Sequence, residues 1–252
     1  MNGPAAELTI VVPTYNEGDR IVELVTALFK AAEAGGLSLA LVIVDDNSPD
    51  GTGQLAERLA GQHRLTVVHR PGKLGLGSAV IDGISAASTA IVGVMDADFS
   101  HPPALVPRLY QAFVRTGADM LVASRYVPGG STPNWPWRRR LLSRLACLMA
   151  RPLTPIRDAT SGFFLLRRSV ADGVAIKASG FKICLELLVR AAPARLVEMP
   201  FQFEDRRAGE SKMALREATG YLVQLRDLYR VRRSTPPPAA RMYRRLAPGE
   251  LD

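Results

Sequence analysis

Two carboxylates separated by one residue follow an apolar run near the middle of the chain. The run Ile91 to Met95 ends at Asp96 and Asp98, and its length and composition predict a buried parallel strand. In an open α/β sheet, ligands bind beyond the carboxyl ends of the strands. Carboxylate oxygens hold hard cations such as Mg²⁺ or Mn²⁺, which often share their coordination shell with substrate phosphates. The stretch therefore predicts a metal site, although Asp is also common in ordinary turns.

Polar residues follow the other predicted strands in the same way. The residues that come directly after a strand are Tyr15, Glu17, Asp45, Asp46, Arg70 and Arg125. Parallel strands bring their carboxyl ends to one edge of a sheet, so residues far apart in the sequence meet there. We therefore expect these side chains to lie near Asp96 and Asp98.

Strands and helices alternate along most of the chain. We predict strands at 8–12, 39–44, 65–68, 91–95, 120–123, 163–166 and 195–199, and helices at 21–34, 54–60, 78–87, 103–115, 141–150, 182–192 and 214–233. This order indicates βαβ units, hence an α/β fold with a Rossmann-like, mostly parallel sheet and helices on both faces. We expect a catalytic domain over 1–215, an amphipathic helix over 216–233 and a disordered basic tail over 234–252.

Composition narrows the class of protein. The chain has 252 residues and a formal charge of +8, which favours a polyanionic partner such as nucleic acid, an anionic membrane or a phosphorylated substrate. Its two cysteines are too few for a disulfide framework, and we expect a reduced, cytoplasmic protein. We expect neither a signal peptide nor a membrane span. A nucleic-acid-binding protein would explain the charge but not the carboxylates at the strand ends.

Two loops resemble known ligand motifs without matching them. The segment Asp46 to Gly51, with Glu57 following, comes near to a calcium EF-hand loop, but it follows a strand where an EF-hand loop follows a helix. The segment Lys73-x-Gly-x-Gly has the cation and glycines of a phosphate loop but lacks the Walker sequence. A simple turn explains the second segment equally well.

A basic and apolar segment over about 135–151 has two interpretations. Arg138 to Arg140 follow Trp135 and Trp137 and precede a leucine-rich helix. A solvated basic face is the usual fate of such a charge run. We favour an interfacial segment, with both tryptophans at the headgroups, the arginines on phosphates and the leucines Leu141, Leu142, Leu145 and Leu148 inserted. A second basic loop, 206–212, would serve as a cationic lid over a phosphate.

In their order, the motifs resemble the polyprenol-phosphate mannosyltransferases, which are inverting family-two glycosyltransferases with a GT-A fold. The resemblance covers about residues 8–215. The motifs that carry it are VPTYNE at 12–17, VDDNSPDGT at 44–52, KLGLG at 73–77, MDADFSHPP at 95–103, ASRY at 123–126, ATSGF at 159–163, GFKI at 180–183 and RAGESK at 207–212.

The resemblance implies GDP-mannose as donor, a divalent cation (Mg²⁺ or Mn²⁺) and a polyprenyl or dolichyl phosphate as acceptor. It places the nucleotide on Pro13, Tyr15, Glu17, Val44, Asp46, Lys73, Asp96, Ala97 and Ser100. It places the metal on Asp96 and Asp98. Catalytic or acceptor-phosphate contacts fall on Arg125, Arg138, Arg139, Arg206, Ser211 and Lys212.

The sequence departs from the family in two places. Phe164 stands where the family often has Arg, and no counterpart of the C-terminal spans of some members follows Arg233. We therefore expect a peripheral protein on the cytoplasmic face of a membrane, with a separate membrane-anchoring protein as one means of attachment. Alternatives are the same fold using UDP-glucose or another sugar nucleotide, and a catalytically silent nucleotide- or lipid-binding module.

The expected reaction needs no general base. The acceptor is a phosphate that is already ionised near neutral pH, so catalysis reduces to positioning and charge stabilisation. The metal and the cations would stabilise the departing diphosphate. His101 is the one histidine near the predicted site, and a structural role flanked by prolines suits it better than a catalytic one.

Overall fold

A computed structural model describes residues 5–176, 182–204 and 214–250 of the chain. Its strands are β1 (Leu8–Thr14), β2 (Leu39–Asp45), β3 (Leu65–His69), β4 (Ile91–Val94), β5 (Met120–Ser124), β6 (Phe164–Arg167), β7 (Arg195–Pro200) and β8 (Met242–Arg245). Its helices are α1 (Gly18–Ala34), α2 (Thr52–Ala60), α3 (Leu76–Ala86), α4 (Val106–Thr116), α5 (Trp137–Ala150), α6 (Arg168–Ala171), α7 (Ile183–Arg190) and α8 (Ala214–Ser234), with short 3-10 turns η1 (Pro103–Leu105) and η2 (Pro248–Glu250).

The strands form one sheet in the order β3-β2-β1-β4-β6-β5-β7-β8. All neighbours are parallel except β6, which runs antiparallel between β4 and β5. Phe164, at the start of β6, therefore pairs with Val94 and Val122 near the ends of β4 and β5. The mostly parallel α/β sheet predicted from the sequence is confirmed.

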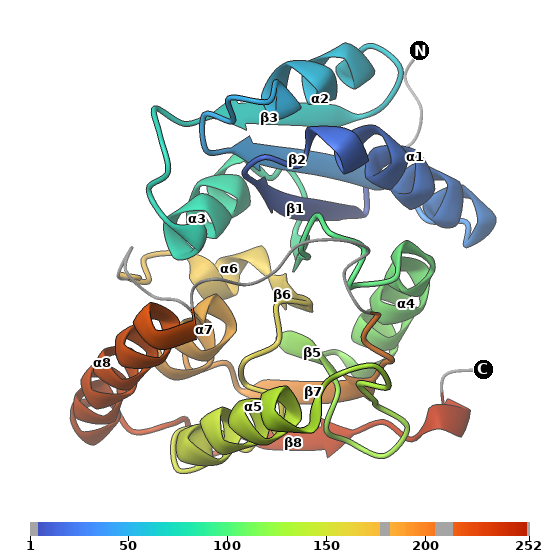
Figure 1. The fold of residues 1–252 in the computed structure, drawn as a ribbon. Coiled ribbons are helices and arrows are strands. Elements are labelled where there is room, and N and C mark those ends of the chain that lie inside the picture. The colour runs from blue at the N-terminus through green and yellow to red at the C-terminus, as the bar shows by residue number, and fades with distance from the viewer. Residues whose placement is uncertain (1–4, 177–181, 205–213, 251–252) are drawn as a thin grey trace.

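Helices cover both faces of this sheet, as Figure 1 shows. Along β1, Ile10 and Val12 belong to the core shared with α1 and α4, whereas Val11 belongs to the core shared with α3, α7 and α8. This alternation follows from the two-residue period of a strand. The strands β1, β2, β4 and β5 are almost fully buried with a core on each side, which explains why their sequences are almost continuously apolar.

The predicted helices and the seven predicted strands are present, with ends that differ by a few residues. Three features were not predicted: the short α6, the antiparallel direction of β6, and β8. The expectation of a disordered tail over 234–252 was wrong for β8, which pairs in parallel with β7. Leu246, just after β8, is buried. Burial of this apolar side chain helps to hold a segment whose prolines and arginines had predicted disorder.

Among the described residues, no helix combines the length and the apolar content that a membrane crossing needs.

Candidate active site

The loop after β4 holds Asp96 and Asp98 in different environments. The Asp98 side chain is buried, with 4% of the residue exposed, and one of its oxygens accepts the Ser100 backbone N–H at 3.0 Å. The Asp96 carboxylate is 35% exposed. Phe99 between Asp98 and Ser100 adopts a φ of 62°, which reverses the chain there. This tight turn keeps both carboxylates at the carboxyl edge of the sheet.

His101 holds the loop that carries Asp96 through a hydrogen bond to its backbone. Its Nδ1 accepts the Asp96 backbone N–H at 3.0 Å, so the ring proton is on Nε2, which lies 3.8 Å from Asp96 Oδ2. The ring is buried and stacks on Phe163, with edge contacts to Phe201 and Phe203. Burial lowers the pKa of His101, while the Asp96 and Asp98 carboxylates oppose that shift. A neutral, buried ring has the structural role predicted from its prolines.

The residues around Asp96 and Asp98 fit a hard cation that is shared with a substrate phosphate. Ser100 Oγ is buried and has no hydrogen-bond partner in the described part of the chain. A Cβ on Gly162 would lie 3.0 Å from Asp96 Oδ2, so glycine keeps space beside that carboxylate. No three His, Cys, Asp or Glu side chains gather into a complete metal cage within the described ranges. Two carboxylates with open positions suit Mg²⁺ or Mn²⁺, which takes its remaining ligands from phosphates and water.

Just after β2 and β3, a buried ion pair fixes residues of the predicted nucleoside pocket. Arg70 Nη1 donates to Asp46 Oδ1 at 2.6 Å, and both side chains are buried. Burial raises the pKa of Asp46, while Arg70 opposes the rise. Arg70 also donates to Ser78 Oγ and to the Gly75 carbonyl. It therefore ties the end of β3 and the start of α3 to Asp46.

Tyr15 and Lys73, from the loops after β1 and β3, contact each other. Lys73 Nζ lies 4.0 Å from the centre of the Tyr15 ring, a cation–π contact between two exposed side chains. The Tyr15 ring presents an apolar face to the edge of the sheet, and Lys73 adds a positive charge. A nucleobase can pack on the ring, and a phosphate can pair with the positive charge.

The remaining predicted nucleotide residues lie at the same edge with other contacts. The Glu17 carboxylate pairs with Arg20 at 3.1 Å, and its backbone N–H donates to Thr52 Oγ1. Val44 is buried in the core, so the backbone is the part of it that a ligand could reach. Pro13 lies at the end of β1, and Ala97 is buried between the two aspartates.

Arg125 is held by a buried carboxylate that the sequence did not reveal. Its Nε and Nη2 donate to the two oxygens of Asp158, each at 2.7 Å, and its backbone N–H donates to Asp158 Oδ2. Asp158 raises the pKa of Arg125 against the effect of burial. The guanidinium also lies against the rings of Tyr126, Trp135 and Phe203. Its position is therefore fixed before any ligand arrives.

A second buried carboxylate fixes the loop that carries Asp158. Glu198 on β7 accepts the backbone N–H groups of Arg157 and Asp158, at 2.9 and 3.0 Å. It also accepts the hydroxyl of Tyr243 on β8. Each contact is a hydrogen bond to a charged acceptor, which is about twice as strong as one between neutral groups.

The interfacial segment 135–151 divides into a buried and an exposed part. The expectation that both tryptophans lie at the headgroups was wrong for Trp135, which is 7% exposed and packs edge-on against Phe203. Trp137 is 68% exposed. Arg139 lies over the Trp135 ring at 4.0 Å, and Arg138 lies 5.5 Å from the Trp137 ring. The sequence showed two tryptophans on either side of Pro136 but not that the first is buried and the second exposed.

α5 exposes the leucines that the sequence predicted, beside the exposed Arg138, Arg139 and Arg144. Besides Trp137, the large apolar side chains that it leaves exposed are Leu141, Leu142, Leu145, Leu148 and Met149. Leu222 and Val223 of α8 are exposed as well, and Tyr221 and Tyr229 of α8 donate their hydroxyls to the Ala146 and Met149 carbonyls of α5. Several large exposed apolar side chains on neighbouring helices are typical of an interaction surface.

Three predicted residues, Arg206, Ser211 and Lys212, lie outside the described residues. Of the others, the structure brings Tyr15, Asp46, Lys73, Asp96 and Asp98 to the ends of the first four strands, and Arg125 and Arg139 to the adjoining side around Trp135. Sequence reasoning missed Arg70 as an organiser and Asp158, Gly162 and Glu198 as supports. The polar turn before β6 was visible, but its place beside the site depends on the antiparallel strand.

The fold and this edge define a glycosyltransferase. The chain belongs to glycosyl transferase family 2, whose family model matches residues 9–174. Within that family, the resemblance to the polyprenol-phosphate mannosyltransferases is confirmed by the similarity of its curated relatives.

Three of these relatives show the extent of the match. The chain is 40% identical over 229 residues to a dolichol-phosphate mannosyltransferase of Pyrococcus furiosus, covering 89% of this chain and 63% of the relative. It is 38% identical to a polyprenol monophosphomannose synthase of Mycolicibacterium smegmatis, covering 85% of each. It is 37% identical to a dolichol-phosphate mannosyltransferase of Saccharomyces cerevisiae, covering 88% of this chain and 87% of the relative. The chain thus spans less than two thirds of the Pyrococcus protein.

A solved structure shares the fold. It is the mannosyltransferase PcManGT from Pyrobaculum calidifontis in complex with GDP-Man and Mn²⁺, with a TM-score of 0.67 and 21% identity, covering 93% of this chain and 66% of that one. The GT-A fold expected from the sequence is confirmed by this similarity.

Proposed function

We propose that this chain transfers mannose from GDP-mannose to a polyprenyl (dolichyl-type) phosphate, with inversion, to give polyprenyl phosphate mannose. The observation that carries the proposal is the pair Asp96 and Asp98 at the edge where Tyr15, Asp46 and Lys73 also lie. The names of the relatives support the choice of mannose and of a lipid phosphate. UDP-glucose is the donor that tests this choice most directly.

The donor would lie across the ends of β1 to β4. Tyr15 and Asp46 would contact the nucleoside, with Arg70 keeping Asp46 in place, and Lys73 would contact a phosphate. Asp96 and Asp98, with Ser100 beside them, would hold Mg²⁺ or Mn²⁺. Such a cation, when bound, neutralises charge on a departing diphosphate.

The acceptor would approach from the side of Arg125 and α5. Two nitrogens of Arg125 are engaged by Asp158, so Nη1 is the nitrogen that can reach an acceptor phosphate. Arg139 lies against the same Trp135 ring as Arg125 and would contribute a second cation, with Arg138 more peripheral. Fixed cations of this kind cost no reorganisation when charge moves.

The reaction would proceed without a protein base. An ionised acceptor oxygen attacks the anomeric carbon in line, the bond to the diphosphate breaks, and the configuration inverts. The protein supplies orientation and positive charge. His101, the closest histidine, is buried with Nδ1 already bonded to the Asp96 N–H, so it has no free basic nitrogen to offer.

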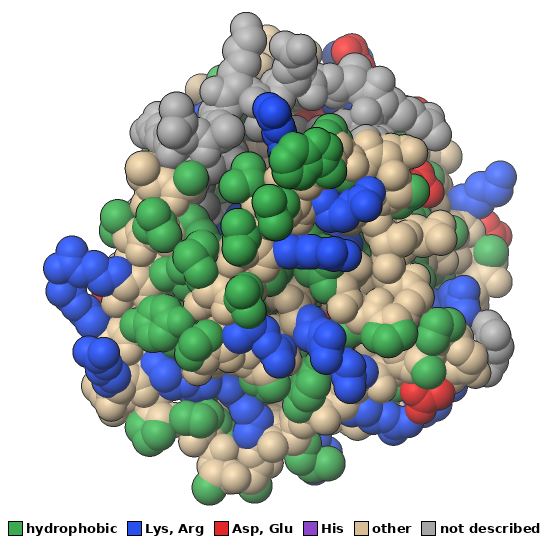
Figure 2. Space-filling view, turned by 60° about the horizontal axis from the view of Figure 1, so that its bottom comes forward, with side chains coloured by type: hydrophobic (Ala, Val, Ile, Leu, Met, Phe, Trp, Pro, Cys, Tyr) green, Lys and Arg blue, Asp and Glu red, His purple; other side chains and the backbone are tan. Residues whose placement is uncertain are grey.

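We also propose that the chain acts as a peripheral protein on the cytoplasmic face of a membrane, with no nucleic acid as partner. The exposed leucines of α5 would enter the bilayer surface, as apolar faces of interfacial helices do. Figure 2 shows this side of the molecule, where hydrophobic and basic side chains alternate and acidic ones are sparse. A separate membrane-anchoring protein is a further means of attachment.

The deciding experiment compares two labelled donors in one assay. Purified chain is incubated with Mn²⁺, a short polyprenyl phosphate and either GDP-mannose or UDP-glucose, and label is measured in the organic phase. Extractable label from GDP-mannose alone supports the proposal. Label from UDP-glucose alone would replace mannose by glucose, and no label from either donor would leave a silent binding module.

A further inference from the structure

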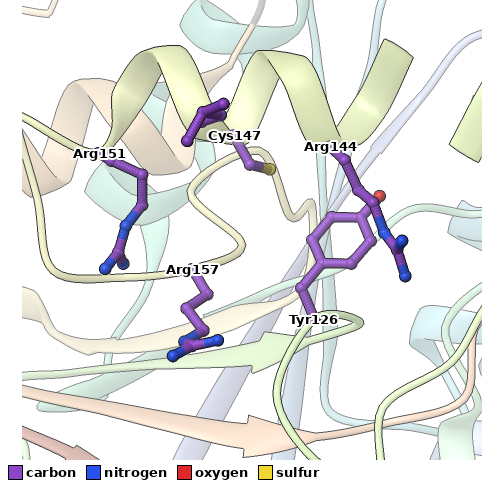
Figure 3. Close-up of a pocket in the computed structure, with 6 residues that line it drawn as sticks. Tyr126, Arg144, Cys147, Arg151 and Arg157 are labelled. Carbon is purple, nitrogen blue, oxygen red and sulfur yellow. The ribbon is translucent and has the colours of Figure 1, made fainter. Parts of the chain in front are cut away.

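A basic depression lies beneath α5, and neither Asp96 nor Asp98 belongs to its lining. Its volume is about 450 Å³, and it is lined by Tyr126, Arg144, Cys147, Leu148, Arg151 and Arg157. Figure 3 shows Arg144 and Arg151 extending from α5 on either side of Cys147, with Arg157 below them. Among the described residues, the lining contains three arginines and no carboxylate.

The three guanidinium groups have few partners. Arg151 Nη1 donates to the Pro155 carbonyl at 2.6 Å, and Arg144 lies 5.9 Å from the centre of the Tyr126 ring. In the ranges that the structure describes, no carboxylate pairs with any of the three. Asp158 lies 3.7 Å from Cys147 Sγ, but both of its oxygens are taken by Arg125. The depression therefore carries positive charge that an anion can neutralise.

The chemistry of the lining selects a phosphate attached to a lipid. Planar guanidinium groups match phosphate oxygens in pairs. Leu148 belongs to the lining and is 64% exposed, and it continues into the apolar face of α5. A ligand that fills this site thus needs a phosphate and, next to it, an acyl chain.

The depression is not placed to hold the phosphate that reacts. That phosphate must lie beside the donor diphosphate, hence beside Asp96 and Asp98. No residue from the loops after β1, β2, β3 or β4 lines the depression. A lipid bound here is a neighbour of the acceptor in the membrane, not the acceptor.

We propose that the Arg144–Arg151–Arg157 depression binds the headgroup phosphate of an anionic phospholipid and thereby sets α5 on the membrane surface. This inference rests on the proposed peripheral attachment. The site gives α5 a fixed depth and rotation, because the headgroup would lie among the arginines of the lining while the leucines enter the acyl region.

The test is cosedimentation with phosphatidylcholine vesicles that contain a minor fraction of phosphatidic acid, without nucleotide or polyprenyl phosphate. Arg144→Ser combined with Arg151→Ser should weaken binding about 25-fold, since each basic residue near such a surface contributes roughly a fivefold factor. The control is Lys30→Ser combined with Arg58→Ser, which removes the same charge from α1 and α2 at the far end of the molecule (Figure 1). Circular dichroism checks that all variants are folded.

The proposal would be overturned by equal weakening in both double variants, by no weakening in either, or by equal binding to vesicles given the same charge by a fatty acid. Displacement by inorganic phosphate at buffer concentrations would also overturn it, because the site would then recognise free phosphate. Transfer to a short acceptor in detergent is measured separately. Normal vesicle binding without transfer would refute the proposed function and leave the lipid site standing.

Discussion

Tyr243 donates its hydroxyl to Glu198 across 2.5 Å, and this bond joins the last strand of the sheet to the loop that holds Arg125. Glu198 holds the backbone of Arg157 and Asp158, and Asp158 holds the Arg125 guanidinium. The position of one cation at the site therefore depends on a strand more than a hundred residues later in the sequence.

Replacing Tyr243 by Phe should lower the free energy of unfolding by about 1.5–3 kcal/mol, the range for a hydrogen bond to a charged group. The matched control is Tyr110→Phe, because the Tyr110 hydroxyl meets Glu7 at 3.3 Å on the surface and should change stability by less than about 0.5 kcal/mol. Urea titration measures both. Equal changes in the free energy of unfolding would mean that the Glu198 contact contributes no more to stability than the surface contact of Tyr110.

Replacing Asp98 by Asn should reduce transfer by at least about a hundredfold, the lower range for losing one electrostatic contact at a reacting centre. Asn keeps the size of the side chain and an oxygen for the Ser100 N–H, so the fold should persist. Asp172→Asn, at the exposed residue just after α6, is the control for loss of one carboxylate and should leave the rate unchanged. Near-normal turnover of the Asp98 variant would remove the carboxylate from the mechanism.

The rate should rise with pH to about 6 and then level off, because the second ionisation of a phosphate monoester lies there. Glu204 lies beside the site, where its backbone N–H donates to the Ser100 carbonyl at 3.2 Å. Glu204→Gln and His101→Gln should retain this profile, and any loss in the second should come from a displaced Asp96 loop. The measurement is initial rate against pH with saturating donor. A collapse of several hundredfold in Glu204→Gln, with both substrates still bound, would reveal a base.

Substitution of Trp137 should affect membrane binding, whereas substitution of Trp135 should affect stability. Trp137→Ser should weaken binding to anionic vesicles while leaving the urea midpoint unchanged, because the side chain is exposed. Trp135→Ser should destabilise the protein by about 3–5 kcal/mol, the range for losing a buried aromatic ring. Vesicle cosedimentation and urea titration of both variants provide the comparison, and the reverse pattern would contradict the assignment of sides.

Cys147 should resist alkylation in the folded protein. Burial raises the pKa of the Cys147 thiol to about 12, so at pH 8 its thiolate is scarcer than that of a free cysteine by a factor of about a thousand. The sign follows directly: burial favours the neutral thiol, so the reactive thiolate forms only at higher pH. With Cys184→Ala as background, the rate should rise tenfold per pH unit through pH 9. Levelling near pH 9 would contradict the raised pKa.

The site could be predicted where it depends on strand ends. Asp46, Asp96 and Arg125 each follow a strand that the apolar runs revealed, and one rule about parallel sheets places all three at one edge. Asp158 could not be predicted in this way, because it precedes a strand. Its place beside Arg125 requires β6 to run antiparallel, and no residue pattern in a short apolar strand encodes direction.

The tail and the tryptophans show a second limit. The segment around Tyr243 has an ordinary basic composition, and only the free edge of β7 gives it a partner. Trp135 and Trp137 have the same type and are two positions apart, yet the first is buried against Phe203 and the second is exposed. Long-range pairing and tertiary packing decide these outcomes, and composition reports neither.

Because β6 runs antiparallel, residues 125–163 form a connection that begins and ends at the same edge of the sheet. The chain leaves the sheet at the end of β5 and re-enters at the start of β6, and both points lie on the edge that carries Asp96. The connection, which contains all of α5, can therefore lengthen, shorten or change its surface without shifting the register of the strands on either side. In such a layout, the surface that we propose for lipid contact can change while the edge that we propose for the nucleotide stays as it is.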